Sequence, residues 1–306
     1  MERKLLSAWC VFLATTILFV AAVEVYHRFQ NERSLNYQYR IIIDKNSIVE
    51  TEEKTSDDIV KKDVDSDSEF YELTKYGYLP KISKSGTGVL DKYSARLEIG
   101  SQKELRLAVL IGEGEKIDDA PNLCNQKVTF IVPHFIDHLE NVVKSIREKG
   151  HEFLLQMPTQ SSIPQNKRET VSPFLANAYS GDTLEKLFYL LGSTKYTLGI
   201  ANVSQTLFTK SKKDMTIIGE ALAKRGLVFF DLEKSNDLAK SVAEKNNLTY
   251  ITAAAIFEGN DFDVSKLNNG DILAVRLEHL ASLIKILPQN WRLTPISASV
   301  KNTTGR

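Results

Sequence analysis

Cysteine is almost absent from this chain of 306 residues, which contains only Cys10 and Cys124. Cys10 lies in an apolar segment near the N-terminus, so the folded part of the chain has a single thiol. An internal disulfide in that part is impossible, and a zinc site built from cysteines is excluded. The chain also lacks a GxGxxG sequence, a phosphate-binding loop and an internal repeat, so no nucleotide-binding motif is present.

A net charge is lacking as well, because 39 basic residues balance 39 acidic residues. Without a basic surplus or a recognition motif, we expect no nucleic-acid partner. The chain is 42% hydrophobic and 25% charged, a composition that supports a packed core. Its length suits one large domain or two ordinary ones.

The N-terminal segment predicts export. Residues 5–25 are mostly apolar, with Glu24 as the only charged residue, and a segment of about 21 residues spans a bilayer. A cleaved signal peptide is the alternative, since residues 20–22 provide small side chains for cleavage. We favour a retained transmembrane anchor. The predicted location is the inner membrane, crossed once, with the globular domain in the periplasm and the membrane as a partner through residues 5–25.

An acidic segment follows the apolar one. Residues 44–69 contain ten acidic residues, four lysines and almost no large apolar side chain. Such a composition cannot bury enough surface to offset the entropy of ordering, and it predicts a disordered linker. The predicted organisation is an anchor at 1–27, an acidic low-complexity linker at 28–80 and a globular domain at 81–306.

Apolar strands and amphipathic helices alternate over about 200 residues of this domain. Residues 128–132 form an apolar run that Pro133 ends, residues 139–146 carry a helical apolar stripe, and residues 153–155 are apolar again. Two strands joined by a helix are most simply parallel. Seven or eight such strands predict an α/β fold with a parallel sheet, open or closed into a barrel.

Polar residues follow several of the predicted strands. In parallel α/β folds, ligand sites lie at the carboxyl ends of the strands, so these side chains are the candidate site. They are Glu113, His134, Asn202, Asp231 and Arg276. Because Arg276 lies in an apolar strand, it needs an acidic partner if it points inward, and we expect that partner to be Glu113 or Asp231.

Five sequence segments carry a resemblance to a known family. Residues 150–158, GHEFLLQMP, are similar to a GHExLLxxPM segment and are the most specific match. The others are VTFIVP at 128–133, LGIAN at 198–202, KRGLVFFD at 224–231 and RLTPIS at 292–297. In order and spacing they resemble the divergent polysaccharide deacetylase family, a branch of the NodB-like carbohydrate esterases. The resemblance covers about two thirds of the chain.

The resemblance implies a distorted (β/α)7-8 barrel and a role in carbohydrate metabolism. It also implies a divalent metal such as zinc, held by Asp and His, that assists removal of acetyl groups from a glycan. Here the family's paired aspartates fall at Gly112 and Glu113, and two of its histidines fall at Val203 and near Leu277. Because Gly, Val and Leu cannot ligate a metal, we expect no metal ligands and no cofactor.

The expected site is therefore a remnant. Glu113 and Asp231 are the candidate catalytic carboxylates, and Asn202, Arg276 and His134 are the candidate substrate-binding residues. His151 and Glu152 precede a strand, at the end opposite a barrel site, so we expect them to belong to the framework.

Two functions follow from these expectations. The preferred one is a metal-free, catalytically impaired pseudoenzyme of the envelope that binds a glycan or a protein. The alternative is an active, metal-dependent carbohydrate deacetylase that removes acetyl groups from an envelope polysaccharide through a rewired site.

Overall fold

The computed structural model describes the globular part of the chain. The described residues are 67–95, 102–112, 120, 122, 124–159, 172–204, 206–233, 236–259 and 262–300. The predicted anchor at residues 5–25, most of the predicted linker and Glu113 lie outside them. None of the described helices is long and apolar enough to cross a membrane. The predicted single-pass, inner-membrane location is corrected by this finding.

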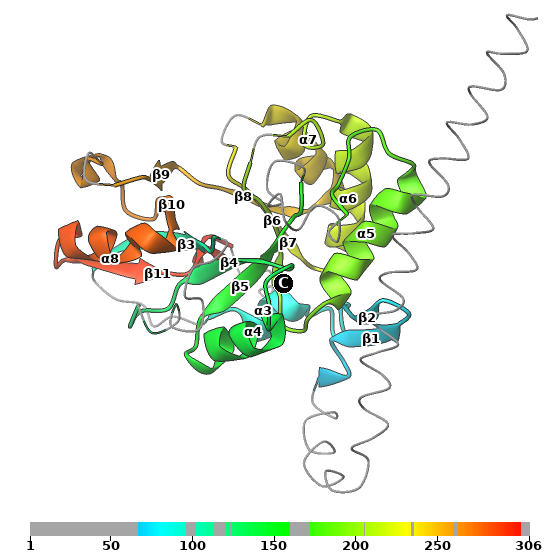
Figure 1. Cartoon of the computed structure of the whole chain (residues 1–306), viewed down its shortest axis with the longest axis horizontal. Coiled ribbons are helices and arrows are strands. Elements are labelled where there is room, and N and C mark those ends of the chain that lie inside the picture. The colour runs from blue at the N-terminus through cyan, green and yellow to red at the C-terminus, as the bar shows by residue number, and fades with distance from the viewer. Residues whose placement is uncertain are drawn as a thin grey trace, which may run out of the picture. The chain divides into compact units, whose positions relative to one another are not determined.

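A parallel sheet forms the centre of the domain (Figure 1). Along the sheet the strands follow the order β8-β7-β6-β5-β4-β3-β10-β9, and β11 pairs with β3. Their bounds are β3 Lys103–Leu110, β4 Thr129–Pro133, β5 Glu152–Gln156, β6 Gly199–Asn202, β7 Val228–Asp231, β8 Thr249–Thr252, β9 Ala255–Phe257, β10 Ile272–Arg276 and β11 Trp291–Thr294. Strands β4, β5, β6 and β7 are buried along their whole length, as expected of a parallel sheet covered on both faces.

The two ends of this path of strands meet in one short segment. Strands β8 and β9 follow each other directly, with only Ala253 and Ala254 between them. The first half of the segment pairs with β7 and the second half pairs with β10. The described strands form a parallel α/β half-barrel sheet, which is consistent with the (β/α)-barrel fold predicted from the sequence.

Helices cover the sheet from outside. They are α3 Val89–Tyr93, α4 Leu139–Glu148, α5 Ser180–Gly192, α6 Lys212–Lys224, α7 Asp237–Asn246 and α8 Leu277–Ile286, with short 3-10 turns η3 Val264–Lys266 and η4 Ile296–Ser299. Helices α5, α6 and α7 lie side by side near β6 to β8, and α8 lies at the opposite end with β9 to β11 (Figure 1). The Ser211 hydroxyl accepts a hydrogen bond from the Asp214 N–H and caps α6.

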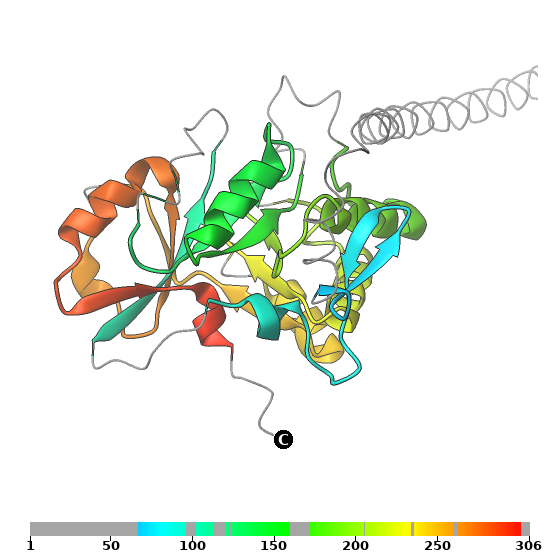
Figure 2. The ribbon, with the colours of Figure 1, turned by 90° about the horizontal axis from the view of Figure 1, so that it is seen from below.

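An antiparallel hairpin precedes the barrel. Strands β1 Tyr71–Thr74 and β2 Gly77–Pro80 pack on α5 (Figure 2). A Cβ atom at Gly192 would lie 1.9 Å from the Tyr76 carbonyl oxygen, so only glycine permits this approach. The hairpin packs on the helix, with Tyr71 and Leu79 buried, and the domain bounds of 81–306 stay a prediction.

Candidate functional site

The strand register places a row of side chains at the carboxyl edge of the sheet. Pro133 is level with Gln156, Gln156 with Ala201, and Asn202 with Asp231. The next residues along the first three strands are His134, Met157 and Asn202. Together with Asp231 they form one row across the four neighbouring strands β4, β5, β6 and β7. The structure thus brings three of the predicted site residues to one edge of the sheet, where ligand sites of parallel α/β folds lie.

Asp231 is the most heavily bonded member of the row. Its Oδ1 accepts hydrogen bonds from Asn202 Nδ2 at 2.9 Å and from the Glu233 N–H at 3.0 Å. Its Oδ2 accepts from Asn236 Nδ2 at 3.0 Å and from the Tyr250 hydroxyl at 3.3 Å. The side chain is fully buried. Burial raises the pKa of the Asp231 carboxyl group, and its donors oppose that rise.

The donors to Asp231 come from loops and strands that sequence reasoning did not combine. Asn236 also caps α7, because its Oδ1 accepts a hydrogen bond from the Ala239 N–H at 3.1 Å. Tyr250 lies on β8, and its ring stacks on Phe229. An Asn directly before a predicted helix is a recognisable cap signal, but its second bond to Asp231 depends on the tertiary fold.

Asn202 is fixed in one orientation by this carboxylate. Its Nδ2 donates to Asp231, so its Oδ1 must face the other way. That oxygen is buried and has no hydrogen-bond partner among the described residues. The hydroxyl groups of Ser204 and Thr159 are 3.1 Å apart. Asn202 therefore keeps one acceptor that the bond to Asp231 does not use.

His134 follows β4 and also carries an unpaired atom. Its Nδ1 is buried without a partner in the described part of the chain, and its ring contacts Phe135 edge to face. Burial lowers the pKa of His134 to about 4, so the imidazole is neutral near pH 7. A neutral imidazole offers either a hydrogen-bond donor or an acceptor.

Glu233 is a third residue with an unpaired atom at this edge, and the sequence analysis did not select it. It follows β7 by two residues, and its Oε2 is buried without a partner among the residues described here. Unpaired buried polar atoms are uncommon in native proteins and call for an explanation such as a ligand or an ordered water.

The row does not fit the metal that the fold family implies. Both oxygens of Asp231 are occupied by two donors each, and Val203 supplies no ligand atom. Within the described ranges, no three His, Cys, Asp or Glu side chains lie close enough to hold a metal ion. Neutral amide, phenol and backbone donors thus take the place that a cation would need.

The expected ion pair between Arg276 and Asp231 is wrong. Arg276 is exposed at the end of β10, and the four partners of Asp231 do not include it. The reason is that neutral donors from nearby loops satisfy this carboxylate. The other expected partner, Glu113, lies outside the described residues. The role of Arg276 in substrate binding stays a prediction.

The opposite, amino edge of the sheet holds His151 and Glu152. Glu152 is fully buried and accepts hydrogen bonds from the Thr129 and Ser297 hydroxyls, each at 2.6 Å. The N–H groups of Ala95 and Ser297 donate to it as well, each at 3.1 Å. Nδ1 of His151 accepts from the Val128 N–H at 3.2 Å. These bonds tie distant segments together, which is the framework role expected of both residues.

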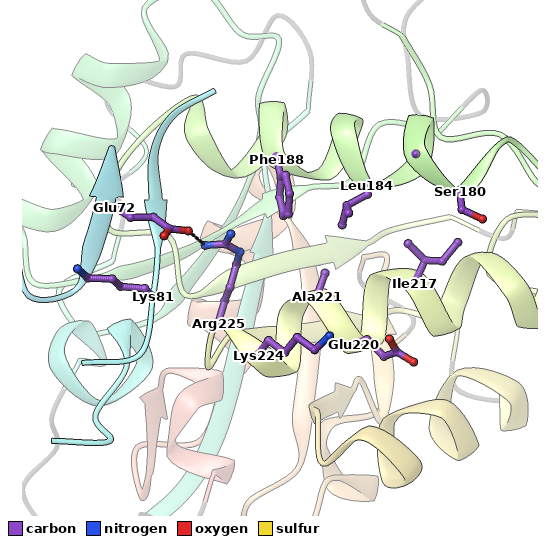
Figure 3. Close-up of a pocket in the computed structure, with 11 residues that line it drawn as sticks. Glu72, Lys81, Ser180, Leu184, Phe188, Ile217, Glu220, Ala221, Lys224 and Arg225 are labelled. Atoms are coloured by element: carbon purple, nitrogen blue, oxygen red, sulfur yellow. Dashed lines mark hydrogen bonds and ion pairs between the residues drawn. The ribbon is translucent and has the colours of Figure 1, made fainter. Parts of the chain in front are cut away.

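A hollow of the described surface lies elsewhere. It is a groove of about 570 Å³ between α5, α6 and the β1–β2 hairpin. Leu184, Phe188 and Ile217 point into it, and the Arg225–Glu72 ion pair, at 2.8 Å, closes one end (Figure 3). None of the predicted site residues lines this groove, so it is separate from the carboxyl edge.

Comparisons with known proteins agree with the resemblance in sequence. A sequence model of the divergent polysaccharide deacetylase family matches residues 111–269. The structure of an uncharacterized protein from Agrobacterium tumefaciens C58 superposes with a TM-score of 0.63 at 19% identity, covering 73% of this chain and 100% of that chain. This similarity supports the fold.

A family 4 carbohydrate esterase from Bacillus anthracis is a more distant match. Its TM-score is 0.34 at 14% identity, over 69% of this chain and 88% of that chain. Among curated proteins, no sequence matches this one. The family match spans half of the chain and contains strands β4 to β9 and four of the five sequence segments described above. The chain therefore belongs to the divergent polysaccharide deacetylase family.

Proposed function

We propose that this chain binds carbohydrate at the carboxyl edge of the barrel and does not hydrolyse it with the help of a metal. The observation that carries the proposal is the state of Asp231. Metal-assisted deacetylation needs carboxylate and imidazole groups that are free to ligate a cation. Each Asp231 oxygen already accepts two hydrogen bonds, so at least one of them would have to break before that oxygen could ligate a cation.

The rest of the row suits a neutral, hydroxyl-rich ligand. His134, Asn202, Thr159 and Ser204 carry uncharged polar groups, and such groups typically orient a ligand in a binding site. The family relationship supports carbohydrate as the ligand class.

The test has two parts on the purified full chain. Metal content is measured by mass spectrometry, and acetate release is measured with acetylated polysaccharides. We expect substoichiometric metal, no turnover and retention of the chain on immobilised polysaccharide. Stoichiometric zinc with turnover that Asp231→Ala abolishes would instead establish the rewired, active deacetylase.

A further inference from the structure

We propose that the groove between α5, α6 and the β1–β2 hairpin is a second carbohydrate-binding site, which holds a short stretch of a polysaccharide chain. This inference rests on the proposed function and adds a surface to it. It is carried by the groove itself, whose volume of about 570 Å³ lies within the range of about 300–1,000 Å³ that is usual for ligand sites.

The walls of the groove offer apolar surface to a ligand. Leu184 and Phe188 point into it from α5, and Ile217 points into it from α6 (Figure 3). All three residues are half-buried. Ala221 follows Ile217 by four residues, as Phe188 follows Leu184, so each helix contributes an apolar stripe about one turn long. Such walls favour a ligand that has an apolar face.

The rim of the groove is polar and carries charges of both signs. Glu220 and Lys224 are exposed, and Lys81 is half-buried. The Glu72–Arg225 ion pair, at 2.8 Å, adds no net charge. A purely apolar ligand would leave these groups without partners, and a strongly charged ligand would meet like charges as well as opposite ones. A neutral sugar fits, because its C–H groups suit the walls and its hydroxyl groups pair with donors and acceptors of the rim.

Tyr179 extends the groove at the end that faces away from the ion pair. Ser180 lies at this end (Figure 3), and Gly181 lines the groove beside it. A Cβ atom on Gly181 would be 2.9 Å from Tyr179 Cε1, so the tyrosine ring lies against the groove. Tyr179 is 76% exposed. An exposed aromatic ring offers a flat surface on which the C–H face of a sugar can stack.

The segment before Tyr179 connects this ring with the carboxyl edge. Residues 172–179 are the last part of the connection between β5 and α5. The Asn177 N–H donates to Asp214 Oδ2 at 2.6 Å, and Lys213 Nζ donates to the Ala178 carbonyl oxygen at 2.8 Å. Both bonds attach the segment to the first turn of α6, so Tyr179 is positioned before a ligand arrives, which lowers the entropic cost of binding. A polysaccharide chain at the carboxyl edge can thus continue over Tyr179 into the groove.

The experiment fills the groove and measures the affinity of the full chain for deacetylated xylan and glucomannan by affinity electrophoresis. Ala221→Trp places an indole ring between the apolar walls. It should raise the dissociation constant about tenfold, the effect of losing a few apolar contacts and hydrogen bonds. Thr216→Trp is the matched control, because it adds the same side chain to the same helix at a residue that does not line the groove. This control should bind as the unsubstituted chain does.

A second pair of variants tests the exposed ring. Tyr179→Ala should raise the dissociation constant about three- to tenfold. Tyr78→Ala is its control, since Tyr78 is also exposed, at 43%, and does not line the groove. It should leave the affinity unchanged. If Ala221→Trp does not fold, Tyr179→Ala still decides, because it alters only an exposed side chain.

The remaining outcomes count against one proposal or both. If Ala221→Trp and Tyr179→Ala fold and bind as tightly as the unsubstituted chain, this inference is overturned and carbohydrate binding at the carboxyl edge stands. A dimer that Ala221→Trp dissociates in sedimentation, with an unchanged affinity for polysaccharide, would assign the groove to a second copy and also overturn it. Failure of the unsubstituted chain to bind any polysaccharide would overturn both proposals.

Discussion

Two buried carboxylates lie at opposite edges of the sheet and differ in the residues that donate hydrogen bonds to them. Glu152 at the amino edge and Asp231 at the carboxyl edge each accept four hydrogen bonds. The partners of Glu152 come from residues 95, 129 and 297, which are far apart in the sequence. At the carboxyl edge, Asn202 bonds Asp231 and keeps one atom unpaired.

The difference indicates a stabilising role for Glu152 at the amino edge, and it agrees with the ligand binding proposed for the carboxyl edge. Glu152 joins β4 and β5 to the C-terminal turn η4 and to the segment after α3, and its side-chain oxygens are fully used. The carboxyl edge carries polar atoms whose partners are absent from the described residues. Proteins tolerate such atoms mostly where a ligand or water completes them.

A substitution of Glu152 at the amino edge should lower the free energy of unfolding the most. Glu152→Gln replaces one acceptor oxygen with an NH2 group that must face existing donors. We expect a loss of about 3 kcal/mol in the free energy of unfolding, measured by urea denaturation. The control is Glu148→Gln on the exposed end of α4, where its ion pair with Lys144 is 3.9 Å long. It should change stability by less than about 0.5 kcal/mol. Equal effects of the two substitutions would contradict the hub role of Glu152.

Asp231→Asn should lower the free energy of unfolding somewhat less, by about 2 kcal/mol, because one donor to this carboxylate, Tyr250, is partly exposed. The substitution also removes a pH dependence. Burial raises the folded-state pKa of Asp231, so the folded chain holds this proton to higher pH than the unfolded chain does. Its contribution is therefore present below the ordinary carboxyl pKa and lost as pH rises through the folded value. Urea titrations between pH 3 and 7 should show a flatter profile for the variant, and parallel profiles would argue against a buried Asp231.

His134 should make the free energy of unfolding depend on pH in the opposite direction. Its pKa is lowered to about 4 in the folded chain, against about 6.5 for an ordinary histidine. The unfolded chain binds the proton first, so stability is complete above about pH 6.5 and falls as pH drops toward 4. Because the His134 residue is only half-buried, solvent screening reduces the effect of this pKa change, and we expect His134→Phe to remove up to about 2 kcal/mol of the stability lost in acid. An unchanged acid profile would show that His134 is solvated.

Tyr250→Phe should have the smallest effect. It removes the hydroxyl that donates to Asp231 at 3.3 Å and retains the ring that stacks on Phe229. Because the bond is long and the side chain is partly exposed, we expect a loss of about 0.5–1 kcal/mol. A loss as large as that of Asp231→Asn would mean that the tyrosine, and not the amides, controls this carboxylate.

Much of the barrel could be predicted from apolar periodicity. The run at 128–132 became β4, the stripe at 139–146 became α4, and the motif at 150–158 includes β5. The β1–β2 hairpin was not predicted, because its strands are short, mix polar and aromatic residues and are stabilised by packing on α5. The division of residues 249–257 into β8 and β9 also depends on which strands meet in space.

The site was less accessible to sequence reasoning. Strand ends identified His134, Asn202 and Asp231 as candidates, since register follows from a parallel sheet. The partners of Asp231 could not be deduced, because Asn236 and Tyr250 reach it through loop geometry. The pairing of Arg276 with Asp231 was wrong for a similar reason: a charge in an apolar strand indicates the need for solvent or a partner, but not which one.

The central claim is that the carboxyl edge binds carbohydrate without a metal. The most direct measurement is the affinity of the full chain for a deacetylated polysaccharide, determined once with EDTA and once with added zinc. We predict equal dissociation constants under the two conditions and no release of acetate from the acetylated form. Binding that EDTA abolishes, together with zinc-dependent acetate release, would contradict the account.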